Sequence, residues 1–168
     1  MYEGFGVTLV FLFFLIIVLL VFSFIAYLCM AIGVYNIAVK SGLKKPWIAF
    51  IPIANHYLLG KLSITNTDET KDLVITHMGW VSLLISGVLH GIESESLFIL
   101  LLIVIVDIAL VAIQLYYMNR ISKLLGANAA LNMVLSIIGL GSFVYLYLGL
   151  KKEIPTVEVI NDPKDREE

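Results

Sequence analysis

Asp107 is the only carboxylate within four long apolar stretches of this chain, which cover residues 6–39, 73–91, 97–117 and 129–150. A charged acid in the hydrocarbon core of a membrane costs roughly 2.5–3.5 kcal/mol, so it is expected to be protonated, hydrogen-bonded or close to a cation. Gln114 lies seven residues further on and therefore shares a helix face with Asp107. Three roles stay open for Asp107: a hydrogen-bonded structural acid, a proton or cation site, or an acid that pairs with a basic residue of another subunit.

The second apolar stretch places small and polar residues on one helix face, which consists of Gly79, Ser82, Ser86 and His90. Small residues let helices approach closely in a membrane, and serine hydroxyls bond between helices, so this pattern predicts a packing face. Counting back from the turn at 91–96 places Asp107 level with Trp80 and Ser82. The predicted intramembrane polar or ion site consists of Asp107, Gln114, Ser82 and His90. The expected hydrogen-bond partners of the acid are Ser82, Trp80, Tyr27, Ser23 and Ser136.

Motifs for catalysis and for metal binding are missing from the sequence. It contains no His-Glu-x-x-His helix, no Gly-x-Ser-x-Gly turn and no phosphate-binding loop. His56, His77 and His90 fall at different depths or faces, and Ser82, His77 and Asp107 do not form a triad because His77 projects away from Ser82. The single cysteine, Cys29, allows neither an intramolecular disulfide nor a cysteine metal site. We therefore expect no catalytic residue, no metal and no cofactor.

The composition places the chain among integral membrane proteins. Apolar residues make up 60% and charged residues 14% of the 168 residues, and the mean hydropathy is +0.98, whereas soluble proteins have about 25% charged residues. One crossing needs roughly 20 apolar residues. We expect an all-α polytopic bundle with four transmembrane helices near 6–39, 73–91, 97–117 and 129–150 in a domain over 1–150, followed by a disordered polar tail over 151–168. The net charge of −2 excludes a nucleic-acid-binding surface.

The segment between the first two stretches has a distinctive sequence of its own. Its apolar part, residues 47–59, is too short to cross a membrane, which predicts an interfacial or re-entrant element over 46–60. Proline begins and then breaks such an element, and tryptophan and tyrosine settle at the level of the headgroups. The candidate docking residues are Lys44, Lys45, Pro46, Trp47, Pro52, Asn55, His56 and Tyr57. The lysines at its ends, Lys44, Lys45 and Lys61, are candidate contacts for anionic lipid.

Lysine and arginine predict the orientation of the chain, since they favour the cytoplasmic side. Loops 40–72 and 118–128 carry seven of them, so these loops are expected in the cytoplasm and the N-terminus outside, in a multi-pass plasma-membrane protein. Four crossings would place the tail outside. The alternative is a break at Gly139 and Gly141 that returns the chain as a re-entrant hairpin, with all eleven basic residues inside. We favour four crossings because a break that faces lipid is costly.

The segment discussed above also carries a family resemblance. The chain contains the pattern Gly42-x-Lys44-x-Pro46-Trp47-x-Ala49-Phe50-Ile51-Pro52-Ile53-x-Asn55-x-Tyr57, and later Ile121-x-Lys123-x-x-Gly126. It resembles a family of small multi-spanning bacterial membrane proteins, largely from Gram-positive species, whose domain has no known function. The resemblance covers roughly 35–150, and the acidic insert 66–72 and the lack of tryptophan clusters in the second stretch depart from it. It implies a bacterial plasma membrane and supplies no catalytic residue.

Two functions remain after these exclusions. The first is a non-enzymatic accessory or scaffold subunit of a bacterial membrane complex, which would bind a membrane-protein partner or further copies of itself. The alternative is a small oligomeric transporter or channel that uses Asp107 as a proton or cation site. Transporters usually show repeats around a polar site at the midplane, and this sequence shows no repeat. The subunit is therefore the preferred hypothesis.

Overall fold

The computed structural model describes residues 3–64, 69–92 and 96–151, and these residues are helical apart from short connections. The all-α prediction is confirmed. Three helices, over Thr8–Lys40, Thr70–His90 and Leu97–Leu124, are long and apolar enough to cross a membrane. The elements in chain order are α1 (Glu3–Lys40), the 3-10 helix η1 (Pro46–Phe50), α2 (Pro52–Ser63), α3 (Glu69–His90), α4 (Leu97–Leu124), α5 (Ala129–Ile137) and α6 (Gly141–Leu150). The predicted tail beyond Lys151 lies outside the described residues.

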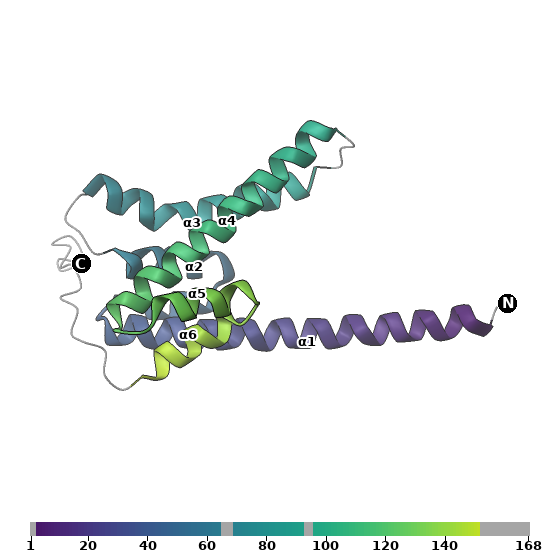
Figure 1. Ribbon diagram of the computed structural model, residues 1–168, viewed down its shortest axis with the longest axis horizontal. Coiled ribbons are helices and arrows are strands. Elements are labelled where there is room, and N and C mark those ends of the chain that lie inside the picture. Colours follow the sequence, from purple (N-terminus) through teal and green to yellow (C-terminus); the bar gives the residue numbers. More distant parts are fainter. Residues whose placement is uncertain (1–2, 65–68, 93–95, 152–168) are drawn as a thin grey trace.

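The fourth apolar stretch is not one helix, so the prediction of a continuous helix over 129–150 is wrong. It forms α5 and α6, which have 9 and 10 residues. At 1.5 Å per residue each is about 15 Å long, roughly half of the hydrocarbon core. The two helices form a hairpin: α5 leads away from the end of α4, and α6 leads back toward the same end of the molecule (Figure 1).

A glycine turn at Gly139 produces this break. Gly139 has a positive φ of 89°, a conformation that ends helices at little cost only for glycine. The N–H of Leu140 donates to the carbonyl of Leu135 at 2.8 Å, and the N–H of Gly139 donates to Ser136 at 3.1 Å. The backbone groups freed by the break are thus bonded locally, which removes the main cost of a helix break in an apolar setting.

The molecule consists of a bundle at one end and two arms that extend from it (Figure 1). The bundle contains the inner half of α1, η1, α2, α5, α6 and the inner parts of α3 and α4. One arm is the outer half of α1, and the other is the antiparallel pair α3–α4. The buried core lies in the bundle and includes Val34, Ile37, Leu58, Leu59, Tyr117, Met118, Ile121, Val144, Tyr145 and Leu148.

Two glycines allow α1 and α6 to cross at very short range. A Cβ atom added at Gly33 would lie 2.3 Å from the backbone of Tyr145, and one added at Gly149 would lie 2.4 Å from the carbonyl oxygen of Gly33. Nearby, the ammonium of Lys40 donates to the carbonyls of Gly149 at 2.7 Å and Lys151 at 2.6 Å. The crossing and this cap hold the end of α6 beside the end of α1.

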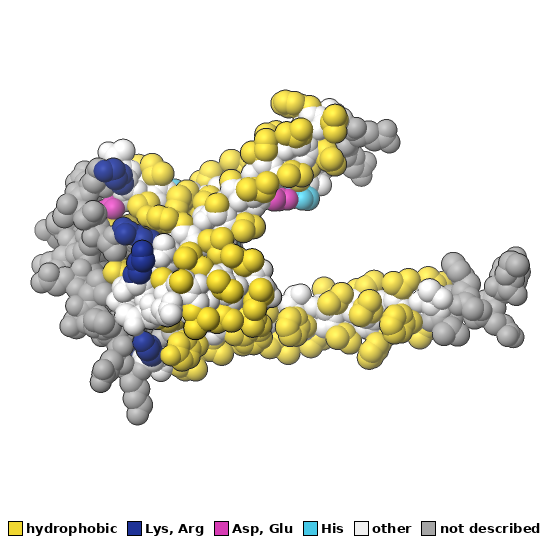
Figure 2. Space-filling model, viewed as in Figure 1, with side chains coloured by type: hydrophobic (Ala, Val, Ile, Leu, Met, Phe, Trp, Pro, Cys, Tyr) yellow, Lys and Arg dark blue, Asp and Glu magenta, His cyan; other side chains and the backbone are white. Residues whose placement is uncertain are grey.

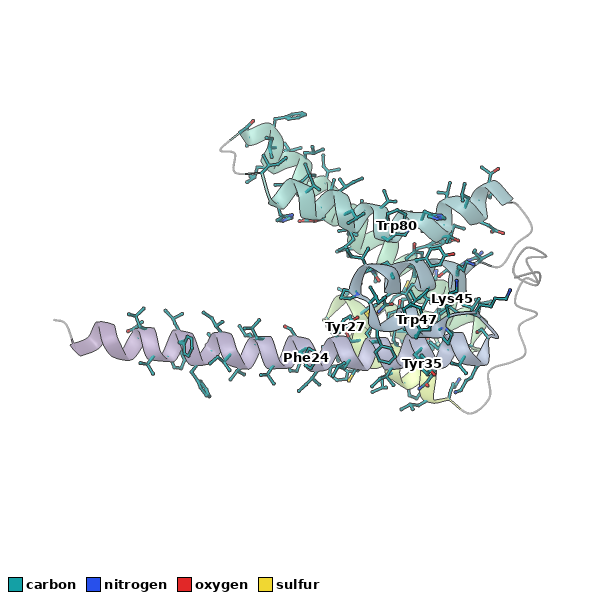
Figure 3. The ribbon with its side chains drawn as sticks, turned by 180° about the vertical axis from the view of Figure 1, so that it is seen from behind. Phe24, Tyr27, Tyr35, Lys45, Trp47 and Trp80 are labelled. Atoms are coloured by element: carbon teal, nitrogen blue, oxygen red, sulfur yellow. The ribbon has the colours of Figure 1, made fainter. Side chains whose placement is uncertain are left out.

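A tyrosine from α4 enters the hydrogen-bond ladder of α3. The hydroxyl of Tyr117 donates to the carbonyl of Ile75 at 2.8 Å and accepts from the N–H of Gly79 at 3.0 Å. Those two backbone groups are four residues apart, so they would bond to each other in an unbroken α-helix. Helices kink where a side chain inserts in this way, and α3 bends close to Trp80 (Figure 3). The bend sets the direction in which the α3–α4 arm leaves the bundle.

Candidate functional site

Asp107 lies in a cluster with two residues of α3. The hydroxyl of Ser86 donates to Asp107 Oδ1 at 2.8 Å, and His90 Nε2 lies 3.5 Å from Asp107 Oδ2. His90 Nδ1 lies 2.9 Å from the carbonyl oxygen of Ser86. A carbonyl only accepts, so Nδ1 carries a proton and Nε2 faces the acid. We call Ser86, His90 and Asp107 the acid cluster.

The acid cluster brings a carboxyl group and an imidazole close together. With Nδ1 donating to the backbone carbonyl of Ser86, Nε2 is the ring nitrogen of His90 that faces Asp107. Hydrogen bonding and a nearby basic group are two ways in which an acid is accommodated on an apolar helix.

The predicted partners of Asp107 were wrong. The acid lies beside Ser86 and His90 rather than at the level of Trp80 and Ser82. The physical reason is the register of the hairpin: His90 ends α3, yet Asp107 is ten residues past the start of α4 at Leu97. The end of α3 and the start of α4 therefore lie at different levels, whereas a symmetric turn would place them at the same level. The hydroxyl of Ser82 bonds within its own helix, to the carbonyl of Met78 at 2.6 Å.

The geometry of the acid cluster differs from that of a catalytic triad. In a triad the imidazole stands between serine and aspartate and accepts the serine proton. Here the hydroxyl of Ser86 donates to Asp107 itself, and the nearer imidazole nitrogen, Nδ1, is bonded to a backbone carbonyl. Although His90 Nδ1 lies 3.4 Å from the hydroxyl of Ser86, the three groups are therefore not in the order serine, histidine, aspartate that a triad requires.

Gln114 is separate from the acid cluster. Its amide nitrogen lies 2.6 Å from His56 Nδ1, so it donates to a ring nitrogen that carries no proton. Burial lowers the pKa of His56 below its ordinary value, which favours the neutral, accepting ring. The bond joins α2 to α4. Of the four residues predicted for the intramembrane site, the structure thus brings together only Asp107 and His90.

The acid cluster is partly open to the outside of the molecule. The side chains of His90 and Asp107 are 54% and 44% exposed. Figure 2 shows acidic and histidine colours side by side on the α3–α4 arm, on the edge that faces the opening toward α1. Across this opening, residues 8–25 of α1 are all exposed. Ser86 itself is buried, whereas the described part of the chain leaves about half of the His90 and Asp107 side chains uncovered.

The proposed docking segment is divided between buried and exposed residues. Asn55 is 1% exposed, and its Oδ1 has no hydrogen-bond partner, while His56 bonds to Gln114. Both side chains therefore point into the bundle and are not docking contacts in this structure. Tyr57 is half-buried and its ring meets the ring of His77 edge-on at 5.8 Å.

The exposed part of this segment is its outer turn. Trp47 is exposed, as are Lys44, Lys45 and Pro52, while Pro46 is half-buried at the start of η1. Lys45 has a positive φ of 60°, which is uncommon outside glycine. Trp47 and Lys45 both lie near the end of the molecule where α1 terminates (Figure 3).

Lysine and arginine side chains gather at this same end (Figure 2). Lys151 Nζ lies 3.5 Å from the carbonyl oxygen of Leu125, just beyond the end of α4, and Lys61 lies over the ring of Tyr57. Together with the cap that Lys40 forms on α6, these contacts place the ends of α1, α4 and α6 at one level. We call this surface the basic end of the molecule.

The fold defines a class but not a family. The described part of the chain is an all-helical bundle with three helices that could cross a membrane, and no group of three potential ligands for a metal occurs in it. Comparisons with family models, with curated proteins and with solved structures found no match. The resemblance carried by the Pro46–Tyr57 pattern therefore stays a prediction.

Proposed function

We propose that this chain is a non-enzymatic scaffold subunit of a bacterial plasma membrane, which assembles with another membrane chain through the face that carries the acid cluster. One observation carries the proposal: His90 and Asp107 are half-exposed on a helix pair whose surroundings are otherwise apolar. The family resemblance in the Pro46–Tyr57 segment is consistent with that location.

Exposure of this pair to lipid would be costly. Hydrocarbon offers no hydrogen bond to the imidazole of His90 or to the carboxyl group of Asp107. Polar groups on membrane helices typically face a bundle interior or water. The exposed half of α1 differs, because residues 8–25 are almost entirely bulky and apolar and suit direct contact with lipid. The arm with Asp107 is therefore the surface that most needs a protein neighbour.

A proton-handling role is the second candidate, and the contact between the imidazole of His90 and the carboxyl group of Asp107 favours it. A pathway would require further polar groups toward both sides of the membrane. On the outer side, the ten residues of α4 before Asp107 are all apolar. Proton flux into liposomes that is lost in an Asp107→Asn variant would establish this role in place of the scaffold.

The scaffold proposal is tested by purification in nanodiscs from the native membrane, followed by native mass measurement. We expect a mass above that of a single chain. Asp107→Asn should reduce the assembled fraction by about tenfold, the effect of roughly 1.4 kcal/mol, because it removes the carboxyl group beside His90.

Ser82→Ala is the matched control, since the hydroxyl of Ser82 bonds only within α3 and its loss should leave assembly unchanged. A chain that purifies from the native membrane as a monomer would refute the scaffold. So would an assembly that Asp107→Asn leaves intact in amount and mass.

We further infer a topology with the N-terminus outside and both ends of the α5–α6 hairpin inside. The support is the gathering of basic residues at the end of the molecule where α1, α4 and α6 terminate, combined with the preference of lysine and arginine for the cytoplasm. This replaces the fourth crossing favoured by the sequence.

Cysteine labelling tests this topology. In a Cys29→Ala background, a cysteine at Thr156 should be protected from a membrane-impermeant reagent added outside intact cells, and a cysteine at Ser94 should react. Permeabilised cells provide the control, because both positions should then be labelled. Reaction of both positions in intact cells would instead restore four crossings.

A further inference from the structure

The face beside the acid cluster has features of a helix contact that the single chain does not use. Gly87 in the last turn of α3 and Gly91, the first residue after it, form a Gly-x-x-x-Gly pattern. The N–H of Gly91 still donates to the carbonyl of Gly87, and at 100° per residue the two glycines lie about 40° apart. A Cβ atom added at Gly87 would meet nothing within 4 Å, and one at Gly91 only backbone of its own helix. His90 lies about 60° from Gly87, so the glycines border the exposed imidazole.

The partner that fits this face is a second copy of the same chain. We propose that two copies pack the α3–α4 arms against each other, with Gly87 and Gly91 at the contact and the acid cluster of each copy covered by the other. This inference rests on the scaffold function proposed above and names the partner of that same face.

Charge complementarity is the main argument for a second copy. The face carries one acidic and one basic side chain, and Asp107 Oδ2 lies 3.5 Å from His90 Nε2. A two-fold axis brings residue i of one copy to residue j of the other and the reverse, so each histidine can approach the partner's acid. A face that presents both an acidic and a basic side chain is therefore complementary to itself.

The glycines make that approach possible. Small residues four apart let two membrane helices come close enough for polar side chains to bond between them. Within the chain, the closest contacts of this kind use other glycines: Gly33 and Gly149 between α1 and α6, and Gly60 against the backbone of Thr76. Among the described residues, none packs from another helix against Gly87 or Gly91, so we assign these two glycines to a contact with a second copy.

Disulfide cross-linking of single-cysteine variants tests the orientation. In a Cys29→Ala background, Leu84→Cys lies about 20° from Gly91 on α3, whereas Ile85→Cys lies about 160° from Gly87; both native side chains are exposed. Oxidation in nanodiscs should cross-link the Leu84→Cys copies at least tenfold more than the Ile85→Cys copies. Equal cross-linking at the two positions would overturn the proposed face.

Native mass measurement of the purified chain alone tests the partner. The wild type should be a dimer, and Gly87→Leu combined with Gly91→Leu should leave mainly monomer with unchanged helix content. Ile85→Leu is the control, because Ile85 is exposed and lies about 160° from Gly87 on α3. If the purified wild-type chain is a monomer, the proposed dimer is wrong. An assembly with another protein in native membranes would in that case still support the scaffold function.

Discussion

Gly33→Ala is expected to destabilise the protein by about 2 kcal/mol, the cost typical of overpacking a tight contact. The new methyl group would lie 2.3 Å from the backbone carbonyl of Tyr145, and backbone cannot rotate away as a side chain can. The two helices must separate, which also draws Gly149 away from the Lys40 cap. Reversible unfolding in mixed micelles measures the change.

Ser23→Ala is the control, since Ser23 is exposed on the outer half of α1, away from the crossing. Alanine has a higher helix propensity than serine, so this variant should be as stable as the wild type or slightly more stable. Equal losses in both variants would contradict a role for the α1–α6 crossing in stability.

Tyr117→Phe is expected to change the direction of the α3–α4 arm. Without the hydroxyl, the carbonyl of Ile75 and the N–H of Gly79 can bond to each other directly, and the cause of the bend in α3 is removed. Two buried hydrogen bonds are lost and one is gained, so we expect a loss of stability of about 1 kcal/mol. The larger effect is geometric.

Spin labels at Leu9 on α1 and Leu101 on α4 measure this change as a distance distribution. The distribution should shift by several ångströms in Tyr117→Phe and stay in place in Tyr147→Phe, whose ring is exposed on α6. An unshifted distribution in the Tyr117 variant would show that packing alone sets the angle between the arms.

Hydropathy alone predicts the all-helical class and the three long helices, because spans of more than 20 apolar residues have no other stable structure in lipid. It does not detect the division of 129–150 into two helices, since residues 137–141 at the break are all apolar or glycine. Gly139 and Gly141 mark the position of the break. The hydrogen bond from the N–H of Leu140 to the carbonyl of Leu135, which compensates for the interrupted helix, is visible only in the structure.

The partners of Asp107 depend on a register that sequence does not determine. A turn between two helices can join ends at different levels, and here it places His90 beside an acid ten residues into α4. The helix face was predictable, because Ser86 and His90 belong to the small and polar face of α3. The level along α3 at which Asp107 lies was not predictable from the sequence. Similarly, α2 is apolar on several sides, so the sequence does not show that Asn55 and His56 point inward.

The hairpin of α5 and α6 has a consequence for how this protein is made. Its turn consists of apolar residues around Gly139, and its two ends lie at the basic end beside α1 and α4. In the topology proposed above, the hairpin would enter the bilayer from the cytoplasmic side, and its turn would carry no charged group through hydrocarbon. The insertion machinery would then translocate no segment beyond the end of α4, and the hairpin could enter last, with α6 packing on α1 and α5 packing on α4.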